Sequence, residues 1–145
     1  MIEPAEVARA LEDEGLTGWL LYDFDGLDPL AQRAAGLEGR LLTRRWFCLL
    51  RRDGPPRWLV HAIERAVFAD RPGEVHTYAG RRELEAGLRS LLAGHERVAM
   101  SYSPQANVPT VSRLDAGTFE LVSRAGGVEI VSAGDLVQRL LAPWP

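Results

Sequence analysis

The 145-residue sequence contains no lysine, since all 17 of its basic residues are arginine. A Schiff-base lysine, a Walker lysine and a lysine general base are therefore excluded. The single cysteine, Cys48, stands inside the apolar run WFCLL, where a lone thiol behaves as a small hydrophobe. One cysteine can supply neither a disulfide framework nor a cysteine-based zinc site.

Long apolar runs are also missing. No window approaches the ~18 consecutive apolar residues of a membrane span, and the opening residues MIEPAEVARALEDEG lack the apolar core of a signal peptide. The net charge of −3, without a block of like charge, gives no reason to expect nucleic acid or an acidic membrane as a partner. We therefore expect a cytoplasmic protein.

Turn signals and apolar runs predict six short strands and about five helices. Two apolar, aromatic-rich runs flank the turn signal RRDGPPR, which is typical of a β-hairpin. The run WFCLL barely alternates, which favours an interior strand covered on both faces. Beyond the hairpin, strands alternate with helices, the last of which is expected to end at Pro143. The pattern predicts one α/β domain over residues 1–145, with three layers and a mixed, roughly six-stranded sheet.

Two helix starts carry local capping signals. In LDPLAQRAAGLEG, Asp28 is expected to cap a short helix that Pro29 begins and Gly36 ends. In VSRLDAGT, Ser112 and Asp115 have the spacing of a capping box, with Ser112 as the N-cap. Both aspartates are thereby given structural interpretations.

The stretch WLLYDFDGLDPL places two aspartates two apart at the end of an apolar run. A phosphatase of the haloacid dehalogenase type presents its nucleophile and its acid in this way, as Asp23 and Asp25 would here. Such a site also needs a hydroxyl, a cation for the phosphoryl oxygens and an acidic pair for magnesium. The candidates for these parts are Ser101, Arg113 or Arg124, and Asp135.

Several departures weigh against that chemistry. Leu27 stands where a small hydroxyl or branched residue is normal, Arg139 stands where the second metal acid is needed, and a complete helix precedes the strand. A calcium loop is rejected because Asp28 and Ala34 occupy the positions that require glycine and glutamate. No G-x-S-x-G elbow is present, so a serine hydrolase is not indicated.

The three histidines are scattered, with no close histidine or cysteine partner in the sequence. His61 is expected to end the strand in RWLVHAIE, where its side chain can reach a pocket. A hydrogen-bonded structural role is the favoured interpretation for it. His95, in AGHER, is expected to be solvated.

Five stretches between about Gly18 and Gln138 follow one another in an order typical of one family: WLLYDFDGLDPLAQRAAGL, LTRRWF, LVHAIE, VAMSYSPQANVPTVSRLDAGTFELV and VEIVSAGDLVQ. Together they resemble the N-terminal domain of the creatinase/prolidase family, which includes Xaa-Pro aminopeptidases. The segment SYSPQANVPTVSRLDAGT is the most specific of them. The resemblance implies a ribonuclease H-like domain with a mixed sheet, in agreement with the six strands predicted from the pattern.

The resemblance also implies that this domain is not the catalyst. In the family, a following pita-bread domain holds two divalent metal ions through two aspartates, one histidine and two glutamates, a set that this sequence does not match. Residues 1–145 are therefore expected to hold no catalytic group, metal or cofactor. The parent would be a metal-dependent Xaa-Pro peptidase. Here the domain would contact its own C-terminal catalytic domain, support a homodimer and shape the active-site entrance for short proline-containing peptides.

Under this interpretation, the loop YDFDGLDP after the first strand faces the substrate or the partner. The residues assigned to that face are Tyr22, Asp23, Asp25, Asp28 and His61. Close relatives usually carry arginine at the Asp25 position and asparagine at the Asp28 position, so two acids replace that pair here. We expect this acidic pair to attract the free amine of a peptide.

Two other functions remain open from the sequence. One is a magnesium-dependent phosphatase that uses Asp23 and Asp25. The other is a stand-alone interaction module that kept the domain without the enzyme. A reading frame that continues beyond residue 145 with the two-aspartate, one-histidine, two-glutamate set would favour the peptidase domain over both.

Overall fold

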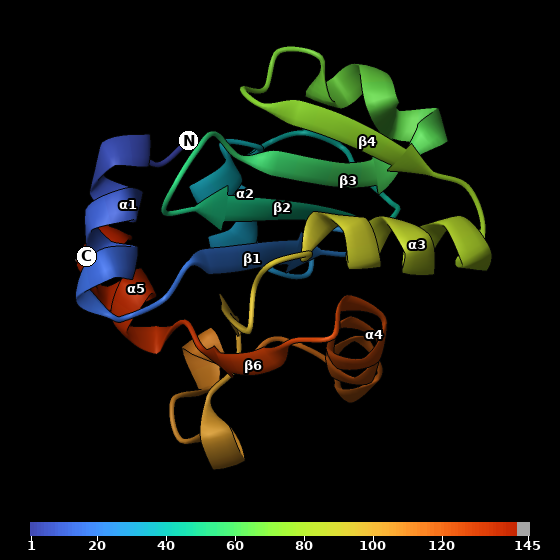
Figure 1. The fold of residues 1–145 in the computed structure, drawn as a ribbon. Coiled ribbons are helices and arrows are strands. Elements are labelled where there is room, and N and C mark those ends of the chain that lie inside the picture. The colour runs from blue at the N-terminus through green and yellow to red at the C-terminus, as the bar shows by residue number, and fades with distance from the viewer. Residues whose placement is uncertain (142–145) are drawn as a thin grey trace.

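The central strands carry apolar side chains on both faces, and the sheet that they form is covered on both sides (Figure 1). The computed structural model describes residues 1–141. Its sheet has the order β4-β3-β2-β1-β5-β6, in which β2 runs antiparallel to both of its neighbours and the other pairs are parallel. The strands are β1 (Gly18–Asp23), β2 (Trp46–Arg51), β3 (Arg57–His61), β4 (Glu74–Tyr78), β5 (Arg97–Met100) and β6 (Glu129–Ser132).

Helices form the two outer layers. Those that pack on one face of the sheet are α1 (Pro4–Asp13), α2 (Pro29–Ala35), α5 (Gly134–Leu140) and the 3-10 helix η1 (Ala62–Phe68). The other face is covered by α3 (Arg81–Leu91) and α4 (Ala116–Gly126). Two single-turn 3-10 helices, η2 (Pro104–Ala106) and η3 (Pro109–Val111), follow β5. No helix within residues 1–141 is long and apolar enough to cross a membrane.

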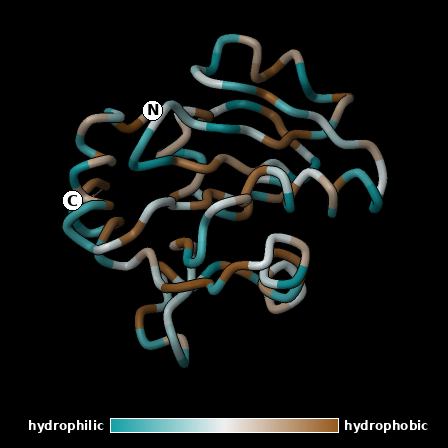
Figure 2. Tube along the Cα trace, in the orientation of Figure 1, coloured by the Kyte–Doolittle hydropathy of each residue, from teal (hydrophilic) through white to brown (hydrophobic). Residues whose placement is uncertain are grey.

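Strand alternation divides the core into two clusters. Along β1, Trp19 and Leu21 pack with α1, α2 and α5, whereas Leu20 and Tyr22 pack with α3 and α4. Figure 2 shows the hydrophobic stretches concentrated along the strands between these layers. The expected three-layer α/β architecture with a mixed six-stranded sheet is confirmed.

Most of the expected elements form. β2 and β3 make the predicted hairpin, and β2 lies inside the sheet with Phe47, Cys48 and Leu49 fully buried. Burial raises the pKa of the Cys48 thiol well above its usual value, which agrees with its reading as a small hydrophobe. Pro143, expected to end the last helix, lies outside the described residues.

One local expectation is confirmed and another was wrong. β3 ends at His61, as expected, and His61 Nδ1 accepts a hydrogen bond from the Ile63 amide and caps η1. Ser112 does not cap α4, because its hydroxyl contacts the backbone of Ser103 instead. Asp115 takes the N-cap position and accepts from the Thr118 amide at 2.9 Å.

The turn before β4 provides a test of packing at its most crowded glycine. Gly73 has a φ of +93°, and a Cβ added there would collide with the carbonyl oxygen of Pro56. Because the backbone would have to shift as well as adopt a strained φ, we expect Gly73→Ala to lower the free energy of unfolding by about 3 kcal/mol in urea denaturation.

Gly94→Ala is the matched control. Gly94 has a similar φ of +87°, but nothing lies within 4 Å of an added Cβ. This variant should lose only about 1–2 kcal/mol, the cost of the strained backbone alone. Equal losses in the two variants would contradict a collision at Gly73.

Candidate functional site

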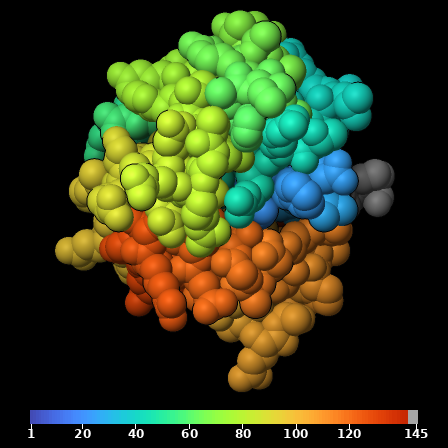
Figure 3. Space-filling view, turned by 90° about the vertical axis from the view of Figure 1, so that its right-hand side faces the viewer, coloured from blue at the N-terminus to red at the C-terminus, as the bar shows by residue number. Residues whose placement is uncertain are grey.

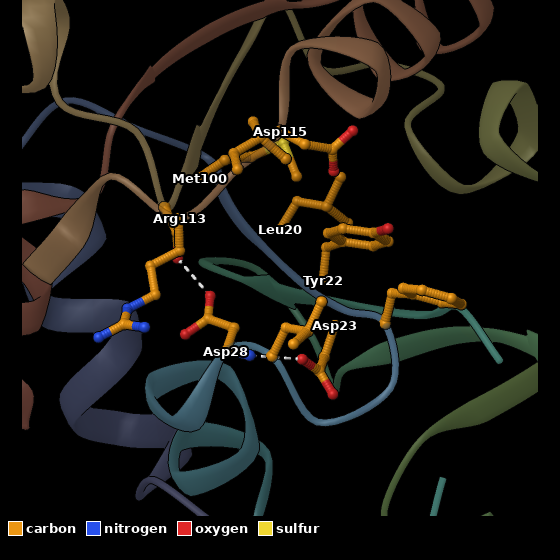
Figure 4. Close-up of a pocket in the computed structure, with 11 residues that line it drawn as sticks. Leu20, Tyr22, Asp23, Asp28, Met100, Arg113 and Asp115 are labelled. Atoms are coloured by element: carbon orange, nitrogen blue, oxygen red, sulfur yellow. Dashed lines mark hydrogen bonds between the residues drawn. The ribbon is translucent and has the colours of Figure 1, made fainter. Parts of the chain in front are cut away.

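A crevice opens where β1 and β5 end side by side. We call it the β1–β5 crevice; it has a volume of about 100 Å³. Its lining combines an apolar wall with three carboxylates and one guanidinium (Figure 4). The residues are Leu20, Tyr22, Asp23, Phe24, Leu27, Asp28, Met100, Ser101, Arg113, Leu114 and Asp115.

The topology of the sheet explains why a crevice forms here. β1 and β5 are parallel neighbours, so their carboxyl ends lie together. The chain leaves β1 toward α2 on one face of the sheet, and leaves β5 toward α4 on the other. Between two connections that diverge in this way, an open α/β sheet leaves a crevice, and such switch points are where ligands commonly bind.

Asp23 closes the loop that follows β1. Its side chain is 1% exposed, and Oδ1 accepts from the Asp28 amide at 2.7 Å. Oδ2 accepts from the Gly26 amide at 3.0 Å and from Gln32 Nε2 at 3.4 Å. Because both oxygens already hold N–H donors from the loop and α2, Asp23 is placed as a structural anchor of the loop.

Asp28 joins two distant segments. Its Oδ1 accepts from the amides of Leu30 at 3.0 Å and Ala31 at 3.2 Å, so the predicted cap of α2 is confirmed. Its Oδ2 accepts from the Ser101 hydroxyl at 3.0 Å, directly after β5. Burial raises the pKa of the Asp28 carboxyl, and the hydrogen bonds from Ala31, Ser101 and Leu30 offset part of that effect.

Asp25 points away from this network. It adopts a φ of 56° at the exposed tip of the loop and is absent from the crevice lining. Among residues 1–141 it makes no hydrogen bond or ion pair. The expected acidic pair is therefore split, with Asp25 exposed to solvent and Asp28 buried.

Tyr22 forms one side of the crevice. Its ring centroid lies 5.0 Å from that of Phe47, and its hydroxyl accepts from Thr118 Oγ1 at 3.3 Å. Burial raises the pKa of the phenol. Tyr22 thus links the end of β1 to the start of α4.

The histidines lie elsewhere. His61 is outside the crevice, where it caps η1 and packs edge-on against Tyr78 at 5.2 Å, consistent with a structural role. His95 is not simply solvated, because Nδ1 lies 2.7 Å from Thr17 Oγ1 and the ring is half-buried. Burial lowers the pKa of His95, with smaller contributions from Arg51 and Arg57.

The parts of a phosphatase site are only partly assembled. Asp23, Ser101 and Arg113 all line the crevice, as the phosphatase hypothesis requires. Asp25 points outward, and Asp135 lies on α5 in a different depression. Arg124 lines a groove between α3 and α4. With the proposed acid outside and the nucleophile bonded through both oxygens, the geometry does not support phosphoryl transfer.

The fold is one known from dipeptidases. It matches a Creatine N superfamily domain of a dipeptidase from Streptococcus thermophilus with a TM-score of 0.71 and 12% identity, over 96% of this chain and 98% of that chain. It matches the creatinase/prolidase N-terminal domain of an X-Pro dipeptidase from Streptococcus pyogenes with a TM-score of 0.69 and 14% identity, over 94% and 97%. At these identities the likeness shows the fold alone.

Whole prolidases extend well beyond this domain. The match to the prolidase from Pyrococcus horikoshii has a TM-score of 0.65 and 11% identity, and covers 94% of this chain but 33% of that one. No family model matches the sequence, and no curated protein matches it. The resemblance to the creatinase/prolidase N-terminal domain is thus confirmed at the level of the fold.

The buried Asp28 carboxyl generates a stability prediction. Asp28→Ala removes the cap of α2 and the bond from Ser101, so we expect a loss of about 2 kcal/mol in the free energy of unfolding. Asp28→Asn keeps a capping oxygen and removes the buried charge, so it should change stability at pH 7 by less than about 0.5 kcal/mol.

The pH dependence follows from the raised pKa. The folded protein binds the Asp28 proton more tightly than the unfolded chain does, so this carboxyl favours folding most at pH below its unfolded pKa. That contribution is lost as pH rises through the folded pKa. The wild type should therefore gain stability relative to Asp28→Asn as pH falls from 7 to 4, and a loss instead would contradict the assignment.

Proposed function

We propose that this chain is the N-terminal, non-catalytic domain of an Xaa-Pro dipeptidase-like metallopeptidase. The observation that supports this most is its correspondence with whole excised domains of dipeptidases, which it covers almost from end to end. The proposed roles are dimerisation and shaping of the active-site entrance for short proline-containing peptides. We also propose a cytoplasmic location for the protein.

The residues of this domain do not fit a catalytic metal pair. In residues 1–141, no group of three or more His, Cys, Asp or Glu side chains is arranged to hold a metal ion. The carboxylate oxygens of Asp23 and the capping oxygen of Asp28 accept N–H donors instead. Two divalent ions would be held by a following catalytic domain, and the N-terminal domain would supply contacts around the substrate.

An apolar patch supports a role in subunit contact. Four large side chains lie exposed near the same end of the sheet: Phe24 (46%), Leu27 (67%), Leu41 (89%) and Ile63 (71%). Their segments are neighbours, because β1 pairs with β2 and the amides of Thr43 and Arg44 both donate to the Glu64 carboxylate. Figure 3 shows these blue, blue-green and green segments adjoining on one face. Exposed apolar groups gathered in this way mark contact surfaces.

Asp25 stands beside this patch. Its exposed carboxylate has no partner among the described residues, so it is free to interact with a group on another molecule. In place of an acidic pair, we propose that Asp25 alone faces the free amine of a peptide at the mouth of a neighbouring subunit's active site.

The protein encoded by the complete reading frame tests the proposed function. We expect it to hydrolyse dipeptides with proline in the second position in the presence of divalent metal ions, and to lose that activity in EDTA. Asparagine tolerates a positive φ, so Asp25→Asn removes only the charge. It should raise KM about fivefold, from the loss of about 1 kcal/mol, with little change in kcat.

Asp135→Asn, which alters an exposed acid on α5, is the matched control and should leave KM unchanged. An unchanged KM in Asp25→Asn would remove Asp25 from substrate binding. Absence of a metal-dependent peptidase activity would favour the alternative function, a stand-alone interaction module. Magnesium-dependent cleavage of a generic phosphate ester that Asp23→Asn abolishes would establish the phosphatase instead.

The apolar patch carries a separate prediction about assembly. Leu27→Asp combined with Leu41→Asp places two charges on the patch, and we expect the dimer of the complete protein to dissociate at least about tenfold more readily in sedimentation analysis. Val108→Asp is the control, since Val108 is 46% exposed but lies outside the patch. Equal weakening by both changes would argue against the patch as the interface.

A further inference from the structure

The inner part of the β1–β5 crevice has no part in the roles proposed above. Phe24 and Leu27 of the apolar patch line the crevice, but its buried carboxylates and its apolar wall lie between the loop after β1 and the end of β5 (Figure 4). Its position at the switch point of the sheet is where α/β domains place ligands. The size, walls and charges of the crevice determine which ligand it would suit.

Size and apolar walls restrict the ligand. A cavity of about 100 Å³ has room for several water-sized groups and is too small for a nucleotide or a sugar phosphate. Leu20, Met100 and Leu114 form an apolar wall at its centre, as Figure 4 shows for the first two. A short alkyl group fits this wall and would gain free energy by leaving water.

The charges on the lining are unbalanced. Three aspartates face one arginine, and none of these four side chains belongs to an ion pair within the described part of the chain. Asp23 accepts from three N–H donors, whereas Asp28 forms no ion pair with a cation among residues 1–141. A buried carboxylate without a cationic partner is costly, and a bound cation would lower that cost.

Asp28 also has capacity for a further donor. Oδ1 already accepts two amides, whereas Oδ2 accepts only the Ser101 hydroxyl and has a second lone pair available. On the opposite rim, Asp115 uses Oδ2 to cap α4, and Oδ1 has no partner among residues 1–141. Two carboxylates of the crevice, those of Asp28 and Asp115, therefore keep capacity to accept a further hydrogen bond.

We propose that the β1–β5 crevice binds a small primary ammonium group carried on a short apolar body. The ammonium donates to Asp28 Oδ2, and the alkyl group packs against Leu20, Met100 and Leu114. Two sources share this chemistry: a free alkylamine, and the amino-terminal residue of a short peptide. The proposal concerns this chain by itself and does not depend on a catalytic domain.

Titration of the isotope-labelled chain with 3-methylbutylamine, followed by amide NMR shifts, tests the proposal. We expect saturable shifts at Asp28, Ser101 and Leu114. The isosteric alcohol, 3-methylbutanol, should bind at least about tenfold more weakly because it cannot form a charge-assisted bond. Equal affinity of the amine and the alcohol, or shifts that do not saturate at these residues, would overturn the proposal.

Matched variants separate the crevice from the loop as a whole. Asp28→Asn keeps the cap of α2 and should weaken amine binding about tenfold. Asp25→Asn makes the same change outside the crevice and should alter binding less than about twofold, since exposed charges are screened. Equal effects of the two variants would overturn the proposal.

Arg113→Ala provides a test in the opposite direction. Arg113 is exposed, so the fold should tolerate the change, and loss of a positive charge should tighten amine binding about twofold to threefold. Weaker binding would mean that the crevice recognises a carboxylate and would overturn the proposal. This readout stays informative even if Asp28→Asn folds poorly.

Leucyl-glycine and its N-acetyl derivative distinguish the two sources. Tighter binding of leucyl-glycine than of 3-methylbutylamine assigns the crevice to the amino end of a peptide, and the reverse order assigns it to a free amine. The acetylated peptide should not bind, and binding as tight as that of the free peptide would overturn the role of the ammonium. Because Asp25→Asn affects KM but not the crevice, failure of this proposal and failure of the proposed function give different results.

Discussion

The carboxylate of Asp23 determines how the chain leaves its first strand. It is almost completely removed from water, where an ionised group is costly unless hydrogen bonds replace the lost hydration. The amides of Gly26 and Asp28 and the side chain of Gln32 supply those bonds, and in doing so they fold the loop back onto the strand end. This closure delivers Asp28 to the first turn of α2, where it caps the helix, and within reach of Ser101. One satisfied carboxylate thus ties together β1, α2 and the end of β5.

The parallel pairing of β1 and β5 brings this local network next to the end of β5. The two strands are far apart in sequence but neighbours in the sheet, and their connections leave toward opposite layers. The Asp28–Ser101 bond links the segments that follow the two strands, and both residues line the crevice. A structural cross-link and a potential binding surface are therefore made by the same side chains, which is why Asp28 bears on both stability and ligand affinity.

The sequence predicts those features that depend on neighbouring residues. Strand and helix periodicity identified the six strands, and the Asp28 cap followed from the proline and the spacing next to it. Ser112 shows the limit of local patterns. Its hydroxyl donates to the carbonyl of Ser103, nine residues away, and Asp115 is the N-cap of α4 instead. The contact of His95 with Thr17 likewise depends on the pairing of β1 with β5, because the two residues are far apart in the sequence.

The crevice could not be predicted from the sequence for a related reason. Leu20 and Met100 look like ordinary core residues in the sequence, and only strand pairing shows that they form one wall. The rule that ligands bind at the carboxyl ends of parallel strands points to the region, but choosing the switch point requires the strand order, which local patterns do not contain.

The two aspartates that resemble a phosphatase motif have opposite environments. Asp23 faces inward, and both of its oxygens accept hydrogen bonds from the donors that build the loop, so it anchors the loop. Asp25, at a positive φ, faces outward, beside the exposed side chains of Phe24 and Leu27. The alternation of inward and outward residues gives the loop two chemically distinct sides. Phe24 and Leu27 line the crevice as well as the outer patch. Contacts with another subunit can still use the outer side while a small cation occupies the inner side, because the cation is held by the buried carboxylate of Asp28.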